Sequence, residues 1–172
     1  PTGKRNYAMF LLMARTGLRI SDVVSLKFSN IDWKSNSILL VQQKTGNNLG
    51  LPLSKELGMA IISYLKNGRP QSSSDCIFVR HNAPYESLNY HNNFNSELRL
   101  YMRRAGITIP KEKHVGVHTL RHSFATNMLR EETSLQDISQ ILGHSSINVT
   151  ETYLRVDIEQ LRQCALDLEV LS

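Results

Sequence analysis

Residues 118–126, HTLRHSFAT, decide how this chain is expected to fold and where its chemistry lies. Apolar residues in and after this stretch recur at the spacing of one helix face, which predicts a helix from about Thr119 to Arg130. His118 and Arg121 stand three positions apart at its start and would therefore share one face. A histidine and an arginine beside a helix N-terminus suit a phosphate, although ordinary polar residues also begin helices.

The same stretch contains the spacing of two zinc ligands, because His118 and His122 are four residues apart. The helical zinc motif of metalloproteases places a glutamate directly after the first histidine, whereas Thr119 stands here. No further carboxylate or cysteine lies close by in the sequence to complete a site. We therefore expect no metal at this position.

Outward from this stretch, helical periodicity covers most of the chain. Gly17 and Gly143 are expected to end two of the helices, and serines are expected to cap others. The predicted helices are about Arg5–Arg15, Ser21–Leu26 capped by Ser21, Ser54–Lys66 capped by Ser54, Phe94–Ala105, a helix capped by Ser134 that ends at Gly143, and an amphipathic stretch Ile158–Leu168.

Short apolar runs of another kind interrupt the helices. Ile38–Val41 and Leu49–Leu53 flank the turn Lys44–Asn48, a pattern typical of a β-hairpin, and Ile77–Val79 is a third strand-like run. Residues 1–172 are therefore expected to form a single domain that is mainly α with a small antiparallel β-sheet, an α+β fold.

Size and composition fit one globular domain with a polyanionic partner. The chain has 172 residues, of which 41% are hydrophobic and 20% charged, and its net charge is +5. The basic balance favours nucleic acid as a partner, although many domains are mildly basic. Because no run approaches the roughly 20 apolar residues that cross a bilayer, no membrane segment is expected.

The cysteines and the first residues bear on location and on how much of the protein is present. Cys76 and Cys164 form no paired motif, which is typical of reduced thiols in a cytoplasmic protein. The chain begins with Pro1 rather than methionine, and its first four residues resemble the end of a linker. We therefore expect the C-terminal part of a longer protein.

Four further residues are candidates for chemistry, and each also has an ordinary explanation. Arg19 precedes a predicted helix, where a guanidinium could clamp a phosphate or simply pair with Asp22. Lys44 lies in the hairpin turn, either positioned to protonate a leaving oxygen or merely solvated. His144 follows a helix end, and Tyr153 comes nine residues later. A tyrosine is commonly a packing residue, and attack by a phenol of pKa about 10 needs a base and nearby cations.

Taken in order, these segments resemble the active site of the tyrosine recombinase, or phage integrase, family. The matching strings are TGLRISD at 16–22, QQKTG at 42–46, HTLRHSFAT at 118–126 and LGHSS at 142–146, followed by Tyr153. The resemblance runs from about Ala8 to Val156. It implies the integrase-like catalytic fold that breaks and rejoins DNA, and it implies a metal-independent, site-specific recombinase.

The resemblance also implies a role for each matching residue. The implied catalytic residues are Arg19, Lys44, His118, Arg121, His144 and Tyr153. The two arginines would clamp the scissile phosphate, the tyrosine would attack it to give a 3′-phosphotyrosyl link, and the lysine would protonate the departing 5′ oxygen. His118 would assist proton transfer at the tyrosine, and His144 would donate a hydrogen bond to the phosphate. Asp22 would orient the site, and His122 would support it.

Family membership implies partners as well. No metal, nucleotide or other cofactor is implied, and the partner is double-stranded DNA, bound by a homotetramer that exchanges C-terminal tails. The stretch Ile158–Leu168 fits such a tail, or packs on its own domain. Because the N-terminal core-binding domain usual in the family does not precede Pro1, weak DNA binding and residual cleavage are expected of this chain alone.

Three other functions compete with this interpretation. A type IB topoisomerase uses the same tyrosine chemistry, but that group usually lacks a histidine at the position of His118 and a string like LGHSS. A catalytically silent DNA-binding module of the same fold is disfavoured because every reactive position is filled. A metal-dependent nuclease is disfavoured because no cluster of carboxylates is present.

Overall fold

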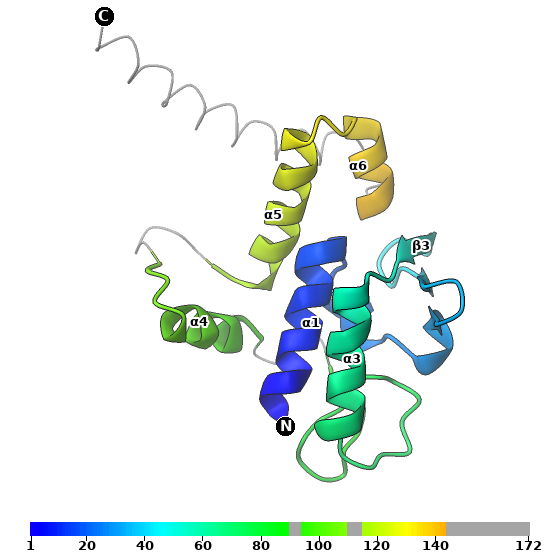
Figure 1. The fold of residues 1–172 in the computed structure, drawn as a ribbon, viewed down its shortest axis with the longest axis vertical. Coiled ribbons are helices and arrows are strands. Elements are labelled where there is room, and N and C mark those ends of the chain that lie inside the picture. The colour runs from blue at the N-terminus through cyan, green and yellow to red at the C-terminus, as the bar shows by residue number, and fades with distance from the viewer. Residues whose placement is uncertain (90–93, 110–114, 144–172) are drawn as a thin grey trace, which may run out of the picture.

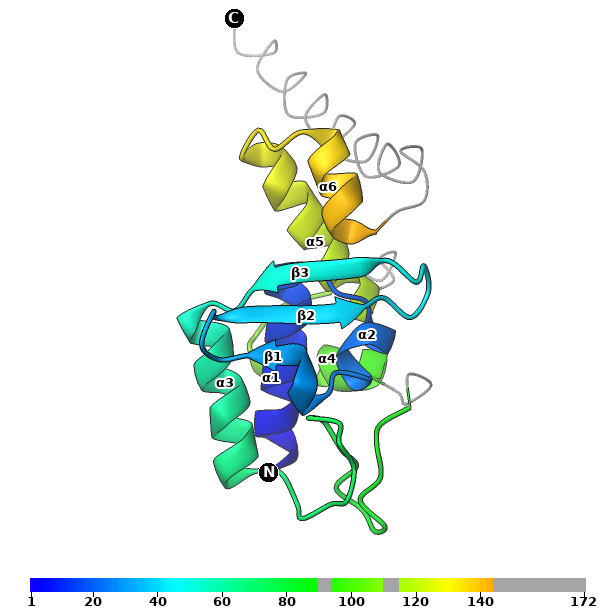
Figure 2. The same ribbon diagram turned by 90° about the vertical axis from the view of Figure 1, so that its right-hand side faces the viewer.

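The computed structural model describes residues 1–89, 94–109 and 115–143. Within these ranges it contains six α-helices, one short 3-10 helix and a three-stranded antiparallel sheet (Figures 1 and 2), which confirms the expected fold class. The elements in chain order are α1 (Thr2–Thr16), α2 (Ile20–Val24), η1 (Phe28–Asn30), β1 (Ile31–Asp32), β2 (Ser37–Val41), β3 (Asn48–Pro52), α3 (Lys55–Asn67), α4 (Phe94–Arg104), α5 (Val117–Arg130) and α6 (Leu135–Leu142).

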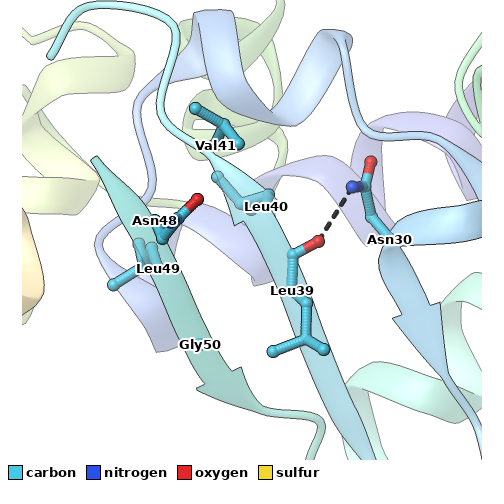
Figure 3. Close-up of a pocket in the computed structure, with 7 residues that line it drawn as sticks. All are labelled: Asn30, Leu39, Leu40, Val41, Asn48, Leu49 and Gly50. Atoms are coloured by element: carbon cyan, nitrogen blue, oxygen red, sulfur yellow. Dashed lines mark hydrogen bonds between the residues drawn. The ribbon is translucent and has the colours of Figure 1, made fainter. Parts of the chain in front are cut away.

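The sheet has the order β1-β2-β3, and its hairpin turn holds Lys44 as predicted. Ile38 is paired with Leu51 and Leu40 with Leu49, so the alternate residues of β2 face the helices. The other face is open, because Leu39 and Val41 are more than half exposed. Figure 3 shows this open face, where the Asn30 side chain donates a hydrogen bond of 2.8 Å to the carbonyl of Leu39.

The main core surrounds α1. In Figure 1 this helix lies between α3 and α5, and its residues Met9, Leu12 and Met13 are fully buried. The sheet lies across it in Figure 2. The core extends to the C-terminal half of α3, where Tyr64 stacks on Phe78 at 5.6 Å between ring centroids. None of the described helices is long and apolar enough to span a membrane.

The helix boundaries confirm several predicted signals. Gly17 and Gly143 both end helices in the left-handed conformation, with φ of 67° and 60°. Ser54 and Ser134 each accept a hydrogen bond from the backbone N–H three residues on, which satisfies a free donor at the helix start. The predicted stretch Ile158–Leu168 lies outside the described residues.

Two local predictions are wrong. Ser21 does not cap α2, because the helix already begins at Ile20 and its N-cap is Arg19, which has an extended backbone. Ile77–Val79 is not a strand of the sheet, although it is fully buried. Cys76 just before the run and Val79 at its end form only isolated bridges, with Lys27 and Ser87 respectively, so the apolar run reflects burial rather than regular pairing.

Candidate active site

Gly17 brings three elements together at one end of α1. A side chain at this position would meet the ring of Phe124 and the side chain of Leu142, at 2.6 Å and 2.8 Å from an ideal Cβ. The left-handed backbone and this lack of space both require glycine. The turn after α1 therefore lies directly against α5 and α6, and it leads into Arg19.

Arg19 lies half-buried just before α2. Its Nη2 donates a hydrogen bond of 3.4 Å to the carbonyl of Gly143. Its Nη1 is buried and has no hydrogen-bond partner among the described residues. Because a buried cationic donor without a partner is costly, this atom favours an arriving anion.

Arg121 of α5 is only 4% exposed and reaches the same turns. Its Nη1 donates to the carbonyl of Gly17 at 2.5 Å, and its Nη2 donates to the carbonyl of Leu142 at 2.6 Å. These bonds fix the plane of the guanidinium between the end of α1 and the end of α6. The structure thus brings Arg19 and Arg121 together, across 102 positions of sequence, around the backbone of Gly17 and Gly143.

Asp22 ties the hairpin to α2. This carboxylate is 2% exposed, and its Oδ1 accepts a hydrogen bond of 2.8 Å from the backbone N–H of Gln43. Its Oδ2 is buried and has no hydrogen-bond partner in the described part of the chain. Lys44 follows Gln43 and is exposed, so the carboxylate anchors the strand end from which Lys44 projects.

His118 is the second residue of α5 and is exposed, whereas Arg121 one turn later is buried. His122 is also exposed. Partial removal from solvent lowers the pKa of His122 below its ordinary value, and the nearby His118 and Arg121 lower it further. Both histidines thus lie on the solvent-exposed side of the first turns of α5. The remaining two predicted site residues, His144 and Tyr153, lie outside the described residues.

Sequence reasoning missed Gln42, which follows β2. It is 1% exposed, and its side-chain amide lies against Gly143, where any Cβ would overlap it. The signal was present in the alternation of β2, because Ile38, Leu40 and Gln42 fall at successive inward positions of period two. A polar residue at the last of these positions is unusual and marks a specific contact.

No group of three histidine, cysteine or acidic side chains that could hold a metal occurs within residues 1–89, 94–109 and 115–143. The charges that converge on the glycine turns are instead those of arginines. A pair of fixed guanidinium groups with an exposed lysine nearby suits the binding of a phosphate diester.

Solved structures give the class to which this fold belongs. The crystal structure of XerA recombinase aligns with a TM-score of 0.76 and 28% identity over 96% of this chain and 58% of that one. XerH site-specific recombinase bound to its palindromic difH substrate aligns with a TM-score of 0.75 over 96% of this chain and 46% of that one, at 24% identity. The fold is that of a tyrosine recombinase catalytic domain.

Sequence comparison gives the family. The model of the phage integrase family matches residues 1–160, and the chain belongs to that family. The putative integrase/recombinase y4rA of Sinorhizobium fredii is 40% identical over 96% of this chain, and tyrosine recombinase XerD of Lacticaseibacillus casei is 33% identical over 94%. The chain spans 39% of the length of y4rA and 54% of that of XerD.

Proposed function

We propose that this chain is the catalytic domain of a site-specific DNA recombinase that cuts and rejoins double-stranded DNA without a metal. The observation that carries the proposal is the convergence of Arg19 and Arg121 on the glycine turns, with Arg19 Nη1 buried and unpartnered among the described residues. XerH site-specific recombinase, which has a similar fold, is bound to its palindromic difH substrate in a post-cleavage complex. The basic net charge of +5 agrees with a DNA partner.

In the proposed cleavage step, the phenol oxygen of Tyr153 attacks the scissile phosphorus while the bond to the 5′ oxygen breaks. His118 accepts the phenol proton, and Lys44 gives a proton to the departing oxygen. Arg19 and Arg121, with a hydrogen bond from His144, stabilise the charge on the nonbridging oxygens. The 3′-phosphotyrosyl link retains the energy of the broken ester, so a different 5′ hydroxyl can reverse the step and rejoin the strands.

Arginine suits the role of phosphate clamp because it stays charged and offers a planar set of donors. The carbonyls of Gly17 and Leu142 hold the Arg121 guanidinium in one plane before any DNA arrives, so little ordering is left for the reaction. We further propose that the active form is a homotetramer on DNA with exchanged C-terminal tails.

The test is a covalent trapping assay with EDTA present. The purified chain is incubated with a pool of nicked duplexes of randomised sequence, in which a cleaved 5′ fragment diffuses away and leaves the protein attached. We expect an adduct that resists denaturation and that Tyr153→Phe abolishes. An adduct that persists in Tyr153→Phe refutes the nucleophile, and the need for a divalent metal refutes the metal-free mechanism. Relaxation of plasmids without site preference would instead identify a topoisomerase.

A further inference from the structure

Gln42 shapes the turn that carries Lys44. Its backbone N–H donates to the carbonyl of Asn47, and its own carbonyl accepts from the N–H of Gly46, both at 2.9 Å. Its side-chain Oε1 accepts a hydrogen bond of 2.8 Å from the hydroxyl of Thr45. Lys44 therefore lies inside a turn that is closed by three hydrogen bonds to one residue.

The same side chain also meets the turn that follows α6. A Cβ at Gly143 would overlap the whole amide of Gln42, so this amide lies directly on the Gly143 backbone. The carbonyl of Gly143 is the acceptor for Arg19. One buried amide is thus in contact with the turn that carries Lys44 on one side and, on the other, with Gly143, whose carbonyl accepts a hydrogen bond from Arg19.

The buried position of the Gln42 amide is energetically unfavourable. Gln42 is 1% exposed, and its Nε2 has no hydrogen-bond partner among the described residues. Leaving a buried donor unsatisfied is unfavourable, and an aliphatic residue would suit an inward-facing position of the sheet better. A polar residue retained at such a position is explained by a role that an aliphatic residue cannot fill.

We propose that Gln42 is a positioning residue that seats the Lys44 turn against the Gly143 turn. The ammonium of Lys44 then reaches the departing 5′ oxygen of a phosphate held by Arg19 and Arg121. The proposal rests on the proposed function, because it needs Lys44 to be the general acid. A displacement of about 1 Å at a reacting group lowers a rate by roughly a hundredfold, so a loosened turn has a measurable effect.

The experiment compares two leaving groups in the covalent trapping assay with the nicked pool. One pool has the ordinary 5′ oxygen at the bond that is cut, and the other has sulfur as the bridging atom. A departing thiolate needs no proton, so cleavage of the sulfur pool does not depend on the acid. For Gln42→Leu we expect a drop of about ten- to a hundredfold with oxygen and near-normal cleavage with sulfur. Gln42→Glu keeps a side-chain oxygen that can accept the hydrogen bond from Thr45, so its cleavage rate with the oxygen pool should fall less than that of Gln42→Leu.

Three comparisons decide the outcome. Thr45→Val removes the hydroxyl from the other side and should show the same sulfur rescue even if Gln42→Leu fails to fold. Gln71→Leu, at an exposed loop position, makes the same chemical change and should leave both rates unaltered. An equal loss on both pools for Gln42→Leu and Thr45→Val would overturn the proposal. Failure of sulfur to rescue Lys44→Ala would instead show that Lys44 is not the acid, which refutes the proposed function at that residue.

Discussion

The body formed by α1, the sheet and α3 differs from the α5–α6 pair in what holds it together. A large cluster of buried apolar residues unites the body, and the start of α5 joins it through Val117 and Leu120. The rest of α5 and α6 has a second cluster whose fully buried members are Ala125, Ile138 and Leu142. Ile141 of α6 is partly buried against the main cluster as well. The pair is also held by polar contacts at the site itself, through Arg121 and the close approach at Gly17.

The candidate site therefore lies on the boundary, or seam, between these two regions. The arginine that would clamp a phosphate also fixes α5 and α6 to the turn after α1. Local stability is not uniform in proteins, and regions with few buried apolar contacts open first. Binding of DNA at this seam should therefore stabilise the α5–α6 pair more than the body.

The largest effect should come from a matched pair of core truncations. Leu12 and Ile138 are both fully buried, and replacing either with alanine costs about 2–5 kcal/mol. Leu12→Ala should lower the unfolding midpoint of the whole domain. Ile138→Ala should raise hydrogen exchange mainly in α5 and α6, with α1 and α3 still protected. If both variants raise hydrogen exchange at the same set of amides, the two regions unfold as one unit and do not differ in local stability.

The second-largest effect should come from Arg121→Met. It leaves the carbonyls of Gly17 and Leu142 without their donors and should cost about 1–3 kcal/mol of stability. The loss should appear as faster hydrogen exchange at the end of α6, together with loss of DNA cleavage. Arg103→Met, an exposed arginine on α4, is the control and should change neither. If DNA cleavage is lost while hydrogen exchange is unchanged, Arg121 does not stabilise the contact between the α5–α6 pair and the body.

Much of this architecture follows from local sequence patterns. Apolar periodicity, glycine stops and serine caps locate α1, α3, α5 and α6, because these signals act within one helix turn. The strand-like run at 77–79 misled because burial and strand pairing leave the same apolar pattern. The meeting of Arg121 with Gly17, 104 positions apart, depends on tertiary packing and could be expected only from resemblance to a family. The alternation of β2 marks Gln42 as an inward-facing polar residue, but its role depends on contact with Gly143, which no local pattern brings near.

Removal of helix caps gives a smaller test of the same contrast. Ser54→Ala at α3 and Ser134→Ala at α6 each remove one side-chain acceptor, at a cost of about 1 kcal/mol. Ser54→Ala should lower the global unfolding midpoint, because α3 is part of the body. Ser134→Ala should mainly increase exchange in α6, and Ser134→Asn should restore it. A global effect from Ser134→Ala would place α6 within the body's cooperative unit.

The smallest effect should be a loss of stability in weak acid. Burial lowers the pKa of His81 below its ordinary value, helped by Arg5, and partial burial does the same for His122. In the unfolded chain both imidazoles bind a proton at about pH 6.5, whereas in the folded state they bind it only at lower pH. The unfolded state therefore holds more protons below pH 6.5, and stability falls as the pH drops through this window.

These two histidines also separate the regions, because His81 stacks on Tyr64 in the body whereas His122 belongs to α5. His81→Gln should reduce the fall of the global unfolding midpoint between pH 7.5 and pH 5.5, two conditions chosen on either side of the ordinary histidine pKa. His122→Gln should reduce the acid-induced exchange of α5 and leave the global midpoint unaltered. An acid effect that survives both substitutions would show that neither histidine is its source.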